Sequence, residues 1–76
     1  MSETDIGSAI VAMRNGWSVT RLGWNEPGQF LTLQVPDEHS KMTLPYIYIT
    51  TVQGDRVPWL ASQTDILADD WEMVPS

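Results

Sequence analysis

The residues best suited to chemistry gather in one stretch, residues 57–71, which reads VPWLASQTDILADDW. Ser62 precedes Asp65 by three positions, the Ser-x-x-acid spacing that often begins a helix. A helix that starts here presents the free N–H groups of its first turn near Gln63, shortly after Trp59 in the chain. An aromatic ring beside such donors suits a nucleotide, because the ring can stack on a base while the donors bind a phosphate or ribose oxygen. The alternative is that Trp59 belongs to the core and Ser62 only caps a helix.

A second group of candidate residues is the segment RLGWN, residues 21–25. Gly23 lets the backbone bend, and Trp24 offers a flat surface. Asn25 can both donate and accept hydrogen bonds, which suits a base edge or a ribose. The alternative is a hairpin corner in which Trp24 folds onto a sheet.

Catalytic machinery is hard to assemble from this sequence. The single histidine, His39, lies in the polar segment 36–41, which we predict to be a solvated loop, so a Ser-His pair or a His-rich metal site has little support. Asp65 and Asp69 share a helix face and Asp70 adjoins them, but the spacing is not that of a calcium loop, and we interpret them as a solvated acidic face. The sequence therefore predicts no catalytic residue, no metal site and no cofactor.

Charge and composition narrow the classes of partner. Ten acidic residues against four basic ones give a net charge of −6, which disfavours binding to DNA or RNA through phosphates. A small anionic ligand needs only a few local donors and remains compatible with this charge. The chain has no cysteine, which excludes disulfides and thiolate zinc sites. An acidic N-terminus and the lack of an apolar run near ~18 residues predict a soluble, cytoplasmic protein without membrane contact.

The hydrophobic pattern predicts an α+β fold. Apolar residues recur at helical spacing over residues 5–15, with Thr4 or Asp5 as N-cap and Gly16 at the end. Alternating runs predict strands, and Ser62 begins a short helix before the last of them. The expected strands are residues 17–21, 30–35, 46–51, a short one that starts at 56–57, and 71–74.

We therefore expect one small domain, residues 1–76, with an N-terminal helix packed on a mostly antiparallel β-sheet and a short C-terminal helix before the last strand. A chain of 76 residues buries only roughly 60% of its unfolded surface, so its core is thin. With neither disulfides nor thiolate zinc to support it, self-association is the expected remedy.

Three segments together resemble a known family. In chain order they read IGSAIVAMRNGWSVTRLGWN, FLTLQV and LPYIYITTVQGDRVPWLASQTDILADDWEMV. They resemble the phage Thoeris anti-defence family of small sponge proteins, the second type described, and the resemblance covers nearly the whole chain. The loop of residues 36–43 does not look shared, so the resemblance does not indicate whether this loop makes a contact.

The resemblance implies sequestration without catalysis. Members of this family bind glycocyclic ADP-ribose, the signal made by bacterial Thoeris defence, and hold it unmodified in the host cytoplasm. Some also capture cyclic dinucleotides of the CBASS type. They are compact homo-oligomers, typically tetramers, with the ligand held between protomers. The other classes that the sequence leaves open are a small nucleotide-processing enzyme and an adaptor that docks on a host protein through an exposed aromatic patch.

The resemblance also implies site residues. Its motifs Gly-Trp-Asn and Pro-Trp-x-x-Ser-Gln-x-Asp match Trp24, Asn25, Trp59, Ser62, Gln63 and Asp65. By this resemblance Trp24 stacks on a base, and Asn25 and Gln63 contact ribose or base edges.

Three further assignments complete the expected site and the core beside it. Arg56 or Arg21 faces the pyrophosphate, and Asp65 accepts a hydroxyl or caps its helix. Trp71 is assigned to the core, together with three aliphatic residues of the same stretch, which are Leu60, Ile66 and Leu67.

Overall fold

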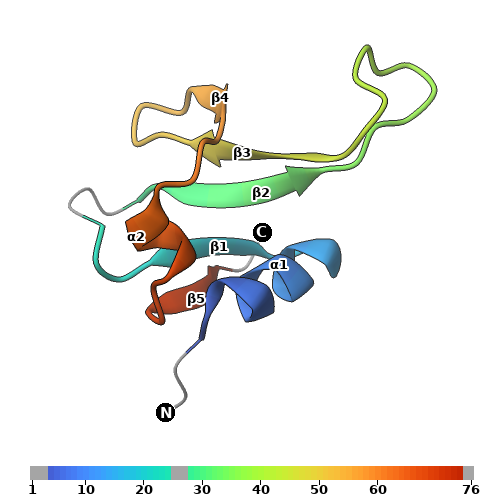
Figure 1. Ribbon diagram of the computed structural model, residues 1–76. Coiled ribbons are helices and arrows are strands. Elements are labelled where there is room, and N and C mark those ends of the chain that lie inside the picture. Colours follow the sequence, from blue (N-terminus) through green and yellow to red (C-terminus); the bar gives the residue numbers. More distant parts are fainter. Residues whose placement is uncertain (1–3, 25–27, 75–76) are drawn as a thin grey trace.

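The computed structural model describes residues 4–24 and 28–74 and has the expected α+β fold (Figure 1). An N-terminal helix packs on a five-stranded sheet, and a short second helix precedes the last strand. The elements are α1 (Ile6–Arg14), β1 (Ser18–Arg21), β2 (Phe30–Gln34), β3 (Tyr46–Thr50), β4 (Arg56–Pro58), α2 (Gln63–Ile66) and β5 (Trp71–Val74). No helix in residues 4–24 and 28–74 combines the length and hydrophobicity that a membrane span requires.

Local sequence explains where α1 begins and ends. Of the two expected N-caps the structure uses Asp5, whose carboxylate accepts a hydrogen bond from the Ser8 N–H at 2.8 Å. At the other end the Asn15 side chain donates to the carbonyl of Val11 at 2.9 Å. Gly16 follows with a φ of 93°, a conformation that favours glycine, and the helix stops there as predicted.

The strands lie in the order β4-β3-β2-β1-β5, and every neighbouring pair is antiparallel. The last strand of the chain therefore lies beside the first, and this pairing sets Trp71 directly opposite Arg21. Helix α1 packs on β1, β2 and β5, while β3 and β4 extend beyond it (Figure 1). One half of the sheet is thus covered by a helix and the other half is not.

The two faces of the sheet differ in chemistry because side chains alternate along each strand. The face toward α1 carries the core, whose buried residues are Ala9, Ala12, Met13, Val19, Leu31 and Trp71. On this face Ile47 and Ile49 lie opposite Leu33 and Leu31, as the alternation predicts. The other face carries hydroxyls and aromatic rings, including Ser18, Thr32, Tyr46 and Tyr48. We call it the hydroxyl face.

The strands are slightly shorter than expected. Trp17 is not part of β1, because its N–H continues the turn after α1 by bonding the Ala12 carbonyl at 3.1 Å. Val35 and Thr51 lie just beyond β2 and β3. Val35 is 63% exposed, so it does not share the burial of Leu31.

The prediction that Leu60, Ile66 and Leu67 belong to the core is wrong. Their side chains are 91%, 46% and 80% exposed. Helix α2 is a single turn, and it points its capping carboxylate inward and its aliphatic residues outward. Trp71 is 2% exposed, which confirms its assignment to the core.

Two matched leucine truncations test this division between core and surface. Leu31 is fully buried, so Leu31→Ala should lower the free energy of unfolding by about 2 to 5 kcal/mol through lost contacts and a new cavity. Leu60→Ala removes the same atoms from an exposed site and should stay within about 0.5 kcal/mol of the parent. Urea denaturation at one fixed protein concentration measures both. Equal losses for the two variants would contradict the observed core.

Candidate functional site

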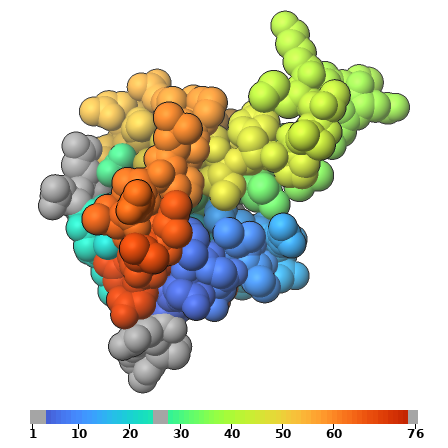
Figure 2. All heavy atoms as spheres, in the orientation of Figure 1, coloured from blue at the N-terminus to red at the C-terminus, as the bar shows by residue number. Residues whose placement is uncertain are grey.

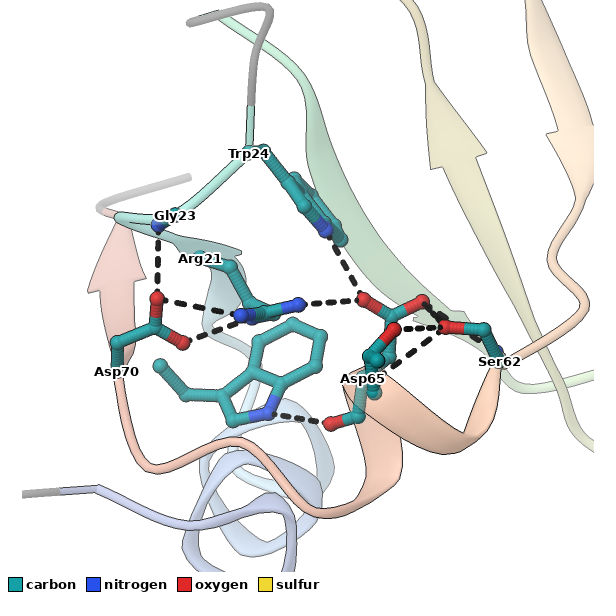
Figure 3. Close-up of polar contacts among 8 residues, drawn as sticks. Arg21, Gly23, Trp24, Ser62, Asp65 and Asp70 are labelled. Carbon is teal, nitrogen blue, oxygen red and sulfur yellow. Dashed lines mark hydrogen bonds and ion pairs between the residues drawn. The ribbon is translucent and has the colours of Figure 1, made fainter.

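Arg21 is the centre of a polar cluster that joins the two segments singled out by sequence (Figure 3). Its Nε donates to Asp70 Oδ1 at 2.7 Å, and its Nη1 donates to Asp65 Oδ1 at 2.9 Å. A third, longer bond of 3.4 Å joins Nη2 to Asp70 Oδ2. The side chains of Arg21, Asp65 and Asp70 are 17%, 14% and 26% exposed, so the ion pairs are largely shielded from water.

Asp65 caps its helix and also binds the loop after β1. Ser62 and Asp65 form a complete capping box, in which each side chain accepts a bond from the other residue's N–H. The same carboxylate accepts the indole N–H of Trp24 at 3.1 Å. The start of α2 and the loop that carries Trp24 are therefore held as one unit (Figure 3).

Asp70 explains the glycine of the RLGWN segment. Its Oδ2 accepts the backbone N–H of Gly23 at 2.7 Å. A Cβ at position 23 would lie 2.7 Å from that oxygen, closer than van der Waals contact allows. Any other residue at position 23 would displace the Asp70 carboxylate and disturb its bonds to Arg21.

Three tryptophans pack beside the cluster. Trp71 meets Trp24 and Trp59 edge to face, with ring centroids 5.5 Å and 6.0 Å apart. Its indole N–H donates to the Asp65 carbonyl at 3.1 Å. Trp24 and Trp59 are half-buried, and both pack against the core.

The cluster keeps both carboxyls ionised. The hydrogen bond from Arg21 lowers the pKa of Asp70 below its ordinary value. Burial raises the pKa of Asp65, but the bonds from Trp24, Arg21 and Ser62 together outweigh burial and lower it. Asp70 and then Asp65 raise the pKa of Arg21. One guanidinium between two carboxylates leaves the cluster with a net negative charge. The charge of Arg21 is therefore neutralised within the chain and is a poor partner for an anionic ligand.

Not all predicted site residues lie together. The structure gathers Arg21, Trp24, Ser62 and Asp65, and Trp59 reaches them through Trp71. Gln63 lines a shallow hollow of about 540 Å³ next to the cluster. Asn25 falls outside the described residues.

Arg56 is separate from the cluster. It lies on β4, and its guanidinium carbon stands 5.9 Å from the centre of the Tyr48 ring. The register pairs Arg56 with Thr50 and Pro58 with Tyr48, which places all four on the hydroxyl face, opposite α1. Gln34, Tyr46 and Val57 complete a small hollow there of about 210 Å³.

The interpretation of the aspartates as a solvated acidic face is wrong for Asp65 and Asp70 and holds for Asp69, which is exposed. The role of Asp70 was missed because its partner lies far away in sequence, at the end of β1. The signal that could have found it is the pairing of the first and last strands, which brings the residue before Trp71 toward Arg21.

The rest of the described chain adds little that resembles a catalytic centre. His39 is 87% exposed in its loop, as predicted, and lies 3.6 Å from a Glu38 oxygen. Within residues 4–24 and 28–74 no three histidine, aspartate or glutamate side chains converge in a way that could hold a metal ion.

Comparison with known proteins gives one consistent result. The sequence profile of the Tad2-like family, described as the Thoeris anti-defense 2-like domain, matches residues 4–74. The chain is also similar to Thoeris anti-defense 2 of Bacillus phage SP01, with 29% identity over 86 aligned positions. That alignment covers 96% of this chain and 97% of the phage protein.

Acid should weaken the cluster. Because the pKa of Asp70 in the folded protein lies below its ordinary value of 3.8, the Asp70–Arg21 pair stabilises the fold above pH 3.8. That stabilisation is lost as pH falls through the folded-state pKa. We expect Asp70→Asn to lower the free energy of unfolding by about 1 to 3 kcal/mol at pH 7. This difference in the free energy of unfolding between the parent and Asp70→Asn should become smaller below pH 3.8.

The matched control is Asp69→Asn, which makes the same charge change at the exposed neighbour. Urea denaturation at a series of pH values measures the three proteins. A difference in the free energy of unfolding between the parent and Asp70→Asn that stays constant down to the pH at which the protein unfolds would contradict the prediction. It would mean that acid does not act through this ion pair.

Proposed function

The chain belongs to the Thoeris anti-defense 2-like family, and on that premise we propose that it binds glycocyclic ADP-ribose and holds it without degrading it. Family membership supports a phage anti-defence role. Sequestration of this signal would keep it from the downstream effector of Thoeris defence. Cyclic dinucleotides of the CBASS type are a second class of ligand that the same proposal includes.

The proposal depends on one observation: Arg21 and Asp65 join two segments that are distant in sequence, the loop after β1 and the start of α2. Trp24 follows β1 and Ser62 begins α2, yet the bonds of Asp65 hold both. A binding surface gains affinity when its groups are fixed before the ligand arrives. The polar cluster thus supports Trp24 in one orientation, and this half-buried residue is the one that we propose stacks on a base.

The charges favour Arg56 over Arg21 as the pyrophosphate partner. Arg21 already binds two carboxylates. Arg56, in contrast, is an exposed residue whose guanidinium lies over the ring of Tyr48. Trp24 packs against the core on the α1 face, and Arg56 belongs to the hydroxyl face. One chain therefore cannot easily bring both to the same nucleotide.

This separation supports a ligand held between protomers of a homo-oligomer, with a tetramer as the proposed form. One protomer would supply Trp24 and a neighbour would supply Arg56. A single small domain with shallow hollows would then enclose a nucleotide that it could not enclose alone.

The same contacts support storage over hydrolysis. A general acid needs a proton to give near neutral pH, and the pKa values of Asp65 and Asp70 are lowered. Both carboxylates are also hydrogen-bonded within the chain. His39 is exposed on a loop beyond the other end of β2, away from the cluster.

An adaptor that docks on a host protein is the second candidate. Exposed aliphatic side chains favour it, among them Leu22, Leu60 and Leu67, which are 68%, 91% and 80% exposed. An adaptor needs no nucleotide, so nucleotide capture separates the two functions.

The first test is a capture-and-release assay. The protein, in molar excess, should deplete glycocyclic ADP-ribose from solution, and heat denaturation should return the same nucleotide intact by mass spectrometry. A processing enzyme would return a product, and an adaptor would deplete nothing. At a hundredfold excess over the dissociation constant the ligand should add about 2.7 kcal/mol to the stability of the folded protein, which raises its melting temperature.

The second test concerns Trp24. If its ring stacks on the base, Trp24→Ala should weaken binding by about 1 to 3 kcal/mol, or about five- to 150-fold, and Trp24→Phe should recover part of this. Trp17→Ala is the matched control, because Trp17 is 40% exposed and lies at the far end of β1. Titration calorimetry gives the affinities, and the melting temperature of each variant reports folding. A folded Trp24→Ala protein with the parent's affinity would exclude Trp24 from the site.

A further inference from the structure

The loop that joins β2 to β3, residues 35–45, forms an arm that extends beyond the rest of the molecule (Figure 1). Figure 2 shows it standing clear of the body as a separate projection. Its turn is shaped locally, because the Asp37 carboxylate accepts bonds from the His39 N–H and the Ser40 hydroxyl. Beyond this turn Met42 and Leu44 are 55% and 75% exposed. The arm thus carries apolar side chains that its own protomer leaves in water.

An apolar groove lies at the base of the same arm. Its volume is about 810 Å³, and it lies between α1 and the neighbouring residues Leu33 of β2 and Ile47 of β3. Met13 and Ile10 form one wall, and Trp59 contributes to another. The rest of its lining is Arg14, Val35, Pro45, Tyr46 and Ala61.

We propose that the arm of a second copy of this chain fills this groove. The groove is at the base of the arm, and the uncovered Met42 and Leu44 are farther along it. A two-fold axis that sets two arms antiparallel places each arm's apolar side chains at the other's base. Both contacts form at once, and the interface is closed because the same surface serves on both copies.

Charge supports a copy of this chain as the occupant. Each copy has a net charge of −6, so two copies repel unless the surfaces that meet are apolar or locally complementary. The groove contains Arg14, one of only four basic residues. The arm carries two exposed acidic residues, Asp37 and Glu38, and one exposed lysine, Lys41, so its net charge is −1. The contact thus brings a weakly acidic arm to a groove with a basic residue.

The lining does not favour a nucleotide as the occupant. Among the described residues that line the groove, Arg14 is the one with a charged side chain, and most of the others are aliphatic or aromatic. This inference rests on the proposed function only in requiring a homo-oligomer, and it adds which surfaces meet. It needs no ligand, so its test is separate from that of nucleotide capture.

Cysteine crosslinking gives the direct test, because the chain has no cysteine of its own. The Met42→Cys protein is mixed with an Ala61→Cys protein that carries a tag, so that the two differ in mass. The mixture is then oxidised with diamide. We expect a disulfide-linked heterodimer, since Ala61 lines the groove. Val52→Cys replaces Met42→Cys in the control, because Val52 is 53% exposed and lies in the turn between β3 and β4. A heterodimer that forms no faster with Met42→Cys than with Val52→Cys overturns the proposal.

Light scattering gives the second readout. The double variant with Met42→Asp and Leu44→Asp should lower the mass of the oligomer, and Val52→Asp should leave it unchanged. Arg14→Glu should weaken assembly, and adding Glu38→Arg to the same chain should restore part of it. An unchanged mass for the double variant rejects the arm contact while the homo-oligomer stands. A parent protein that is monomeric rejects both the arm contact and the homo-oligomer. Crosslinking in a protein that captures no nucleotide rejects only the proposed function.

Discussion

The ion pairs of Arg21 are the contact on which the site depends. They join the end of β1 to α2 and to the residue before β5, more than forty positions later in the chain. The buried core is small and lies under α1, and α2 contributes no buried residue to it. Hydrogen bonds to ionised groups therefore hold α2 in place, whereas burial of apolar side chains holds α1. Loss of the guanidinium would leave two shielded carboxylates without a positive charge beside them, which is a costly arrangement.

Much of the fold was predictable because its signals are local. The Asp5 cap, the glycine after α1, the alternation in β3 and the capping box at Ser62 each involve neighbours in sequence. The site was predictable only in part. Asp70 pairs with Arg21 across 49 positions, and no local pattern indicates that partner. Leu67 looked like core because it is apolar, but a one-turn helix fixed by its cap has no second turn with which to bury that side chain.

The distribution of the candidate residues over two faces changes how the motifs are interpreted. Trp24 and Ser62 both bond to Asp65, so the sequence motifs that contain these three residues describe a structural unit. Arg56 belongs to the hydroxyl face with Tyr48. Under the proposed function, a ligand that contacts both Trp24 and Arg56 would need more than one protomer.

Strand β4 has a consequence for behaviour at high concentration. It forms one edge of the sheet, has only the three residues Arg56–Pro58, and ends in a proline that has no N–H to offer another strand. A short edge that lacks a donor is a poor template for adding further strands. Chains that meet there cannot readily extend the sheet into a fibril. An acidic protein with many uncovered aliphatic side chains is thereby protected, at this edge, against open-ended growth of its sheet.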